Sequence, residues 1–313
     1  MEQAEALFHS GVDATLPAAK PLLLYYAFLN LTKAYSLTEK HERTLSNARH
    51  GLSEQQPAGS TGLTGAWLDA YASKPGQVPN AFAEHLKSFG GFTLPAAKTA
   101  YTIADLLPQV VPGHRLWCEA AGQVERFIAL DEIQPMEDRA TKTIWLRFWI
   151  SEQDLSRLGV THAAFLRRAG LADAWREVNP EATAATPLRR LLFEQKAPEE
   201  YRGRAADRVL QLLRAFRPLL WATVASIPPY RRYYVYLAPN ADRSRVLPQL
   251  GSIYALIYYL GSVTRYRPQE FDAIVVGSHG PQVLELLTNQ PNQYLYLVAS
   301  EFARREVARA SIV

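Results

Sequence analysis

The stretch PLLLYYAFLNLTKAYSL, residues 21–37, decides the fold that we predict for this chain. It begins with a proline, which suits the first turn of a helix, and nearly every helical face within it is apolar. A helix that is hydrophobic all round is buried inside a protein. Two polar residues, Asn30 and Lys33, lie three positions apart and would form a narrow polar stripe along this helix. The stripe needs hydrogen-bonding partners, because a polar group buried without one costs free energy.

A second strong helix is predicted for residues 245–266, near the other end of the chain. Gly251 and Ala255 lie four positions apart on one helical face, so a neighbouring helix can approach closely there. Pro268 marks the end of this helix. Further helices are predicted for residues 80–89, 163–178, 204–225 and 295–307.

Short runs rich in β-branched and aromatic residues fill the centre of the chain. We predict from them a small antiparallel sheet and one further strand. The runs are HRLWCEA at 114–120, ERFIALDEI at 125–133, TKTIWLRFWI at 141–150 and RRYYVYLAP at 231–239.

These patterns predict an α+β protein that is predominantly helical. Its architecture would be a helical bundle formed by the N- and C-terminal segments, with a small central antiparallel β-sheet. Residues 1–98 would form an N-terminal helical section, residues 99–240 a central section of strands and helices, and residues 241–313 a set of C-terminal helices that pack back on the first section. The length of 313 residues fits one large or two ordinary domains.

Composition places the chain among ordinary folded proteins. Hydrophobic residues make up 48% of it and charged residues 20%, which argues against disorder. The single cysteine, Cys118, has no partner for an intrachain disulfide, and this fits a reducing compartment. The first residues lack a signal-peptide pattern, and no apolar run reaches the roughly 18 residues needed to cross a bilayer. We therefore expect a cytoplasmic protein that does not enter the membrane, and its net charge of +4 favours anionic partners.

Several common chemistries have no support in the sequence. The seven histidines are scattered, without an H-E-x-x-H motif or a Cys/His cluster, so we predict no metal site. Neither the G-x-x-x-x-G-K-[ST] loop of ATPases nor the dinucleotide-binding G-x-G-x-x-G pattern occurs, so we predict no cofactor. Ser278 and His279 are adjacent in sequence and poorly placed to act as a nucleophile and its base.

Two stretches near opposite ends of the chain carry a family resemblance. The first is residues 21–37 followed by HGL at 50–52, and the second is YYLGSVTRYRPQEFD at 258–272. Together, in this order, they resemble the YaaC-like family of mostly uncharacterised bacterial proteins. The first stretch, which contains YYA, also resembles a helix of HEPN-type domains. These are small helical bundles, and many of them cleave RNA without a metal ion by means of an arginine and a nearby histidine.

The HEPN-type resemblance implies that Arg43 and His50 are the catalytic pair. Six residues separate them, and in a helix Arg43, Asn47 and His50 would share one face. A histidine can take up or give a proton during RNA cleavage, while an arginine holds the phosphate. Asn47 and Arg49 would bind the substrate beside this pair. The alternative is a solvated, basic helix end that contains Arg43, Arg49 and His50.

Four further residues are candidates for substrate binding. Asn30 and Lys33 would form a polar floor beneath the catalytic pair, or else a buried network that fixes the helix register. Arg265 and Arg267 would contact phosphate, or else stabilise the C-terminus of their helix through its dipole.

The resemblance implies an RNA-directed, HEPN-like protein that acts as a metal-independent endoribonuclease in stress or phage defence. RNA would be its partner, and a homodimer could complete the site. The alternative is a non-catalytic interaction or scaffold protein whose basic surface binds a protein partner. This alternative follows from the lack of a complete catalytic constellation in the sequence.

Overall fold

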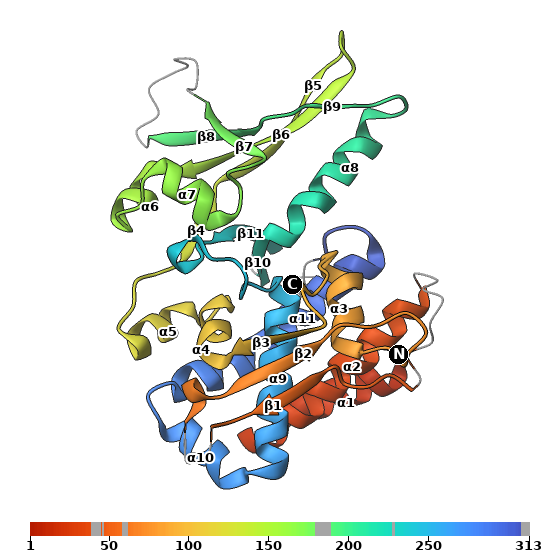
Figure 1. Cartoon of the computed structure of the whole chain (residues 1–313), viewed down its shortest axis with the longest axis vertical. Coiled ribbons are helices and arrows are strands. Elements are labelled where there is room, and N and C mark those ends of the chain that lie inside the picture. The colour runs from red at the N-terminus through yellow and green to blue at the C-terminus, as the bar shows by residue number, and fades with distance from the viewer. Residues whose placement is uncertain (39–44, 46, 58–61, 179–188, 227–228, 308–313) are drawn as a thin grey trace. The chain divides into compact units, whose positions relative to one another are not determined.

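The computed structural model describes residues 1–38, 45, 47–57, 62–178, 189–226 and 229–307 (Figure 1). The chain divides into two compact units. Unit 1 comprises Met1–Gln123, Thr223–Tyr230 and Arg245–Val313, and unit 2 comprises Val124–Ala222 and Arg231–Ser244. Both units combine helices with antiparallel strands, which confirms the α+β class.

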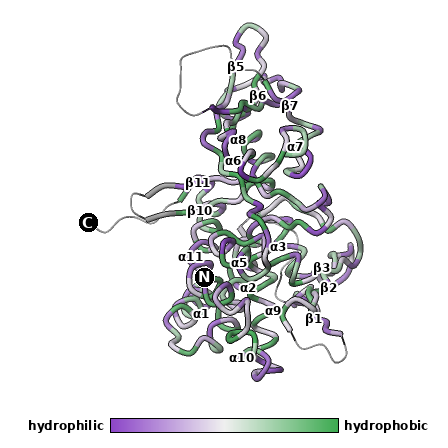
Figure 2. The backbone as a smooth tube through the Cα atoms, turned by 90° about the vertical axis from the view of Figure 1, so that its left-hand side faces the viewer, coloured by the Kyte–Doolittle hydropathy of each residue, from purple (hydrophilic) through white to green (hydrophobic). Residues whose placement is uncertain are grey.

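Unit 1 is built around two apolar helices, α2 (Lys20–Thr38) and α9 (Gln249–Tyr266), and both were predicted from the sequence. Leu24 and Phe28 of α2 and Ile257 of α9 are fully buried. Each such side chain stabilises the fold by about 1.5–3 kcal/mol relative to an exposed one. Both helices carry hydrophobic colours along much of their length in Figure 2. No helix in the described residues is both long and apolar enough to cross a membrane.

The other helices of unit 1 come from both ends of the chain. They are α1 (Glu2–Asp13), α3 (Ala81–Gly90), α4 (Ile103–Leu106), α5 (His114–Ala121), α10 (Pro268–Val276) and α11 (Gly280–Ala303). Buried residues of α1, α3 and α11 belong to the same hydrophobic core as those of α2 and α9. That the N- and C-terminal helices are arranged as a helical bundle stays a prediction.

Unit 1 also contains a three-stranded antiparallel sheet. Its strands are β1 (Leu52–Gln55), β2 (Trp67–Tyr71) and β3 (Lys98–Thr102), in the order β1-β2-β3. Leu52 lies opposite Ala70 across the first pair. The sequence analysis did not predict β1 and β2, because strands of four and five residues are too short to show a clear alternation.

Unit 2 contains a larger antiparallel sheet, which confirms that the centre of the chain forms one. Its strands are β5 (Glu132–Asp138), β6 (Thr143–Ser151), β8 (Arg190–Gln195) and β7 (Trp175–Val178), in that order, and β9 (Glu199–Glu200) pairs with β6. Buried and partly exposed residues alternate along β6, as expected for a strand with one covered face. The buried face packs against α6 (Glu152–Arg157), α7 (His162–Ala169) and α8 (Ala205–Phe216).

Outside this sheet, β4 (Phe127–Leu130) pairs with β11 (Pro229–Tyr236), and β10 (Leu220–Ser226) precedes β11 in the chain.

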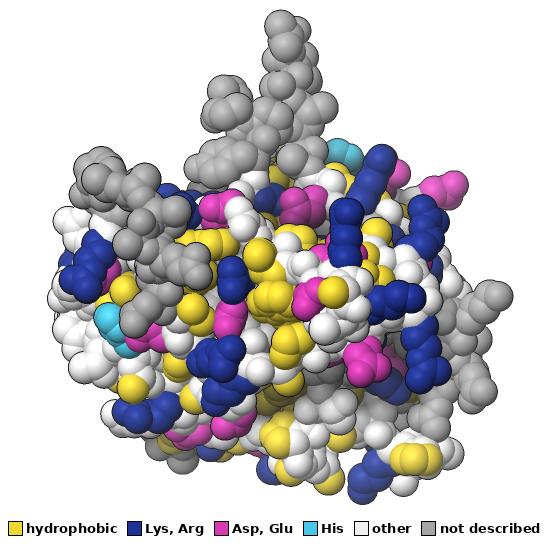
Figure 3. All heavy atoms as spheres, turned by 90° about the horizontal axis from the view of Figure 1, so that it is seen from above, with side chains coloured by type: hydrophobic (Ala, Val, Ile, Leu, Met, Phe, Trp, Pro, Cys, Tyr) yellow, Lys and Arg dark blue, Asp and Glu magenta, His cyan; other side chains and the backbone are white. Residues whose placement is uncertain are grey.

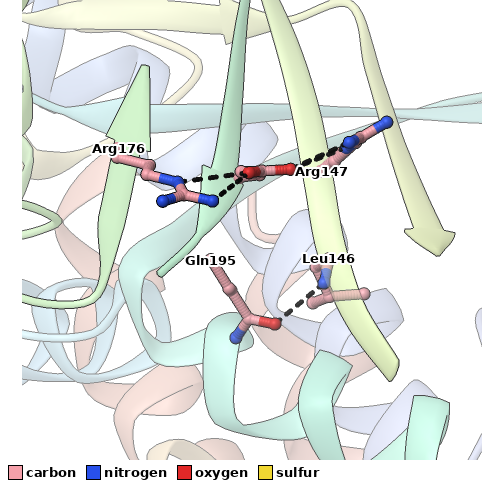
Figure 4. Close-up of polar contacts among 5 residues, drawn as sticks. Leu146, Arg147, Arg176 and Gln195 are labelled. Carbon is pink, nitrogen blue, oxygen red and sulfur yellow. Dashed lines mark hydrogen bonds and ion pairs between the residues drawn. The ribbon is translucent and has the colours of Figure 1, made fainter. Parts of the chain in front are cut away.

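On the larger sheet, the carboxylate of Glu194 binds two arginines of neighbouring strands (Figure 4). The distance is 2.9 Å to Arg147 and 2.8 Å to Arg176. The side chain of Gln195 accepts a hydrogen bond from the backbone N–H of Leu146 at 2.8 Å.

The segment HRLWCEA forms α5, so the strand predicted there is wrong. His114 and Trp117 are its buried residues, and they lie three positions apart, which is helical spacing. Gly122 ends the helix in the left-handed conformation, with φ of 60°.

Two predicted helices are too long. The helix predicted for 163–178 ends at Ala169, because Gly170 adopts a left-handed cap with φ of 72°, and β7 follows. The helix predicted for 204–225 ends at Phe216. Pro218 has no N–H to continue the hydrogen bonds of the helix, so the chain makes a single 3-10 turn at Arg217–Leu219 and then continues as β10.

Candidate functional site

Backbone hydrogen bonds hold His50 in an irregular segment just before β1. The N–H of Ala81 donates to the carbonyl of Arg49 at 2.8 Å, and the N–H of Phe82 donates to the carbonyl of His50 at 3.1 Å. Both donors belong to the first turn of α3, where N–H groups have no partner within the helix. Gly51 adopts a φ of 78°, which glycine tolerates best. The start of α3 and Gly51 therefore fix the position of His50.

The helical face predicted for Arg43, Asn47 and His50 does not form in the part of this segment that the structure describes. Asn47 lies in a turn, and Arg49 forms an isolated β-bridge with Asn80. The side chains of Asn47 and Arg49 are exposed. Arg43 lies outside the described residues.

Two tyrosines contact the imidazole of His50. The hydroxyl of Tyr25, on α2, forms a hydrogen bond with Nδ1, and the ring centroids are 5.5 Å apart. The ring of Tyr258, on α9, lies 6.1 Å from that of His50, and its hydroxyl donates to the carbonyl of Leu52 at 2.9 Å. The two central helices of unit 1 thus anchor a histidine that is still exposed to solvent.

The hydrogen bond with Tyr25 is compatible with a proton on either ring nitrogen of His50. Burial raises the pKa of Tyr25 well above its usual range, so its hydroxyl stays protonated. This hydroxyl can accept the Nδ1 proton, which leaves the Nε2 lone pair available as a proton acceptor. It can instead donate to Nδ1, and Nε2 then carries the proton. Neutral His50 can therefore serve as an acceptor or as a donor through Nε2.

Two positively charged side chains act on the histidine. Burial lowers the pKa of His50 below its ordinary value, and the charges of Lys33 and Arg265 lower it further. A lowered pKa keeps the imidazole neutral at pH 7, which is the form that can take up a proton. Three of the residues predicted from the sequence therefore interact electrostatically: the charges of Lys33 and Arg265 act on His50.

The helices that carry the two cations are antiparallel. The ring of Tyr25 lies 5.1 Å from that of Tyr258. Further along, a Cβ atom placed on Gly261 would lie 3.4 Å from the carbonyl oxygen of Pro21. Higher residue numbers in α9 therefore face lower ones in α2.

As a consequence, Lys33 and Arg265 lie in opposite directions from His50. Lys33 follows Tyr25 by eight residues and Arg265 follows Tyr258 by seven. At about 1.5 Å per residue, these steps are about 12 Å and about 10 Å along the helix axes. The backbone positions of the two cations therefore lie on opposite sides of the level at which Tyr25 and Tyr258 meet His50.

Arg267 connects the end of α9 to the strand that follows His50. Its guanidinium forms an ion pair with Glu54 of β1 and another, at 2.9 Å, with Glu270 of α10. Gln56 also donates to Glu270 at 2.9 Å. Two carboxylates thus balance the charge of Arg267, and in this arrangement it holds β1 against α9.

Asn30 makes a contact within its own helix. Its Nδ2 donates to the carbonyl of Tyr26 at 2.9 Å, and the side chain is partly buried. No cluster of three or more His, Cys, Asp or Glu side chains among the described residues could hold a metal ion.

Three residues of this arrangement were not predicted from the sequence: Tyr25, Tyr258 and Glu54. Both tyrosines stand in apolar helices, where the hydrophobic pattern predicts only core positions. Their chemistry is the signal that could have found them, because a buried tyrosine hydroxyl usually has a hydrogen-bond partner. The pairing of Glu54 with Arg267 leaves no such signal, since 213 positions separate them.

We call His50, Tyr25, Tyr258, Lys33 and Arg265 the His50 cluster.

Comparison of the chain with curated proteins and with solved structures gives no match. The HEPN-type resemblance therefore has no support beyond the sequence features that raised it. A family model described as YaaC-like Protein matches residues 1–302, which is nearly the whole chain. The chain thus belongs to the YaaC-like family.

Proposed function

We propose that the His50 cluster binds the phosphodiester backbone of RNA and cleaves it without a metal ion. One observation carries the proposal: an exposed histidine, held by Tyr25, is close enough to Lys33 and Arg265 to feel both positive charges. Two cations on separate helices beside His50 attract a polyanion such as RNA.

The chemistry needs only groups present in the chain and in RNA. In the tautomer in which Nδ1–H donates to Tyr25, Nε2 of His50 takes the proton of a ribose 2′-hydroxyl. The 2′-oxygen then forms a bond to the adjacent phosphorus, and the bond from phosphorus to the 5′-oxygen breaks. The leaving 5′-oxygen takes a proton from the imidazolium or from water. The products are a 2′,3′-cyclic phosphate and a 5′-hydroxyl, while Lys33 and Arg265 stabilise the charge on the phosphates.

The test is an RNA cleavage assay in EDTA with the wild type and His50→Gln. Loss of a general acid or base lowers rates by about 10²- to 10⁴-fold, so we expect His50→Gln to fall at least 100-fold. Lys33→Ala and Arg265→Ala should weaken RNA binding and reduce its dependence on salt, because each removes a phosphate contact.

Exposed residues elsewhere provide matched controls. His9→Gln, Lys87→Ala and Arg202→Ala remove the same side-chain types from α1, α3 and unit 2. We expect wild-type activity in all three. Equal cleavage by the wild type and His50→Gln, or no cleavage by either, would rule out a catalytic role for His50.

A second function is favoured by the face of the larger sheet in unit 2. Trp145 and Trp149 are partly exposed there, and the guanidinium groups of Arg147 and Arg190 each lie 5.8 Å from one of these rings. Figure 3 shows hydrophobic side chains among basic and acidic ones on the side of the molecule that it views. Tryptophan and arginine are enriched at the centres of protein interfaces, so this face is a candidate for a protein partner.

This scaffold function would be independent of His50. We expect Trp149→Ser to reduce recovery of a cross-linked protein partner at least tenfold and to leave RNA cleavage unchanged. Unchanged cross-linking in Trp149→Ser would remove the support for this second function. A circular dichroism spectrum that matches the wild type is the control for folding.

A further inference from the structure

Tyr266, at the last position of α9, is unusual among the aromatic residues of this chain. Its exposed fraction is 68%, and it is the only Phe, Tyr or Trp in the exposed class among the residues whose side-chain burial the structure describes. Most of the surface of this ring is therefore open to a ligand. Such a ring next to a charged site is a typical feature of nucleic-acid binding.

A ring contact and an electrostatic effect connect Tyr266 to the His50 cluster. The guanidinium of Arg265 lies 5.1 Å from the centroid of the Tyr266 ring, and the charge of Arg265 also acts on His50. Tyr266 is close enough to Tyr258 to raise its pKa, although burial is the larger cause. Tyr258 in turn lies beside the ring of His50. Tyr266 therefore stands at the rim of the cluster, where a strand bound to Arg265 would pass.

We propose that Tyr266 stacks on an unpaired base, so that the ligand of the His50 cluster is single-stranded RNA. This inference rests on the proposed function and adds to it that the bound RNA is single-stranded. A base can stack on an exposed aromatic ring whatever its identity, because every base has a π-face. In a duplex the bases are already stacked on one another, so one of them would first have to unstack. The site should therefore prefer single strands and show little preference for sequence.

The test uses single-stranded RNA oligonucleotides in which every ribose is 2′-O-methylated. These cannot be cleaved, because the nucleophilic hydroxyl is blocked. Fluorescence anisotropy measures their binding before and after one base is removed at each position in turn, and a duplex of the same sequence is measured beside them. For the wild type we expect removal of one base, at the position that meets Tyr266, to weaken binding about tenfold.

Variants at Tyr266 assign this effect to the ring. Tyr266→Ala should bind the complete strand about tenfold more weakly than the wild type does and should no longer respond to the missing base. Tyr266→Trp should retain both properties. Tyr234→Ala is the matched control, because Arg232 lies 5.8 Å from the ring of Tyr234 in unit 2, and it should behave as the wild type.

The outcomes separate the two proposals. If the wild type binds RNA but Tyr266→Ala keeps the response to the missing base, the stacking role is wrong and the proposed function stands. Equal affinity for single strands and duplex would also overturn the inference alone. If the wild type binds none of these oligonucleotides, the proposed function fails and the inference fails with it.

Discussion

His50 and His85 belong to the same unit and both contact side chains of α2, yet their surroundings differ. His85 is fully buried, and its Nδ1 forms a hydrogen bond with Thr32 at 2.9 Å. Its ring lies 4.6 Å from that of Tyr254. His50 is exposed and has cations nearby. The first is a neutral part of the core, whereas the second can meet a ligand.

Burial is the main cause of the lowered pKa in both histidines, but the consequences differ. At His85 it lowers the pKa to about 3, because a charged imidazole has no access to water there. At His50 the neighbouring charges of Lys33 and Arg265 add to the effect. A lowered pKa alone therefore does not identify a functional histidine. What distinguishes His50 from His85 is its exposure together with charged neighbours on separate helices.

The largest expected effect concerns the stability of the fold at low pH. In the folded protein His85 stays neutral down to about pH 3, whereas in the unfolded chain it takes up a proton near pH 6.5. The unfolded state therefore binds more protons between these values, and the free energy of unfolding falls as the pH is lowered through this window. The slope from this group approaches about 1.4 kcal/mol per pH unit.

Urea unfolding between pH 7 and pH 4 measures this slope. His85→Gln should flatten it, because glutamine does not titrate, while His50→Gln should leave most of it in place. The same slope in His85→Gln and in the wild type would show that His85 is not the group that limits stability in acid.

The second effect concerns the backbone that holds His50. Gly51→Ala should destabilise the fold by about 2 kcal/mol, because it forces a side chain into a left-handed conformation. A Cβ at this position would also lie 2.8 Å from the Cβ of Asn80. Gly76 has a similar φ of 73° with nothing within 4 Å of its Cβ position, so Gly76→Ala is the matched control.

We expect Gly76→Ala to cost about 1 kcal/mol, the conformational part alone. The comparison uses thermal and urea unfolding of the two variants. Equal losses would mean that the contact between Gly51 and Asn80 does not restrict the segment that carries His50.

The smallest effect concerns the ion pair between Glu54 and Arg267. A double-mutant cycle with Glu54→Gln and Arg267→Met should give a coupling of about 1 kcal/mol, because the exposed fractions of the two side chains are only 10% and 34%. The pair Glu137 and Arg139 is the control, because the side chain of Arg139 is 89% exposed and its distance to Glu137 is 3.5 Å, so its coupling should be near zero. A coupling at Glu54 and Arg267 no larger than that of the control would mean that this pair does not hold β1 against α9.

The sequence predicted those parts of the fold in which one strong period runs through a long segment. The apolar helix of residues 21–37 and the alternation in TKTIWLRFWI are of this kind, and both elements formed. The segment 114–120 was misread because it contains aromatic residues typical of strands, whereas its buried positions follow a helical period. Strands β1 and β2 were missed because each is too short to show an alternation.

The candidate site was only partly accessible from the sequence. His50, Lys33 and Arg265 were named from resemblance and charge, and they proved to be electrostatic neighbours. The partner of His50 could not be found in this way, because Tyr25 lies 25 positions away and looks like a core residue. Contacts between distant segments depend on how helices pack, and a hydrophobic pattern does not encode that.

The most direct test of the central claim is an NMR titration of His50. Burial lowers the pKa of His50, and the positive charges of Lys33 and Arg265 lower it further, so the wild-type value should lie below 6.5. Both Lys33→Met and Arg265→Met should raise it, while Lys87→Met, on α3, should leave it unchanged. A His50 pKa at or above 6.5 that neither substitution moves would contradict the account, because the histidine would then not feel the charges of the two cations.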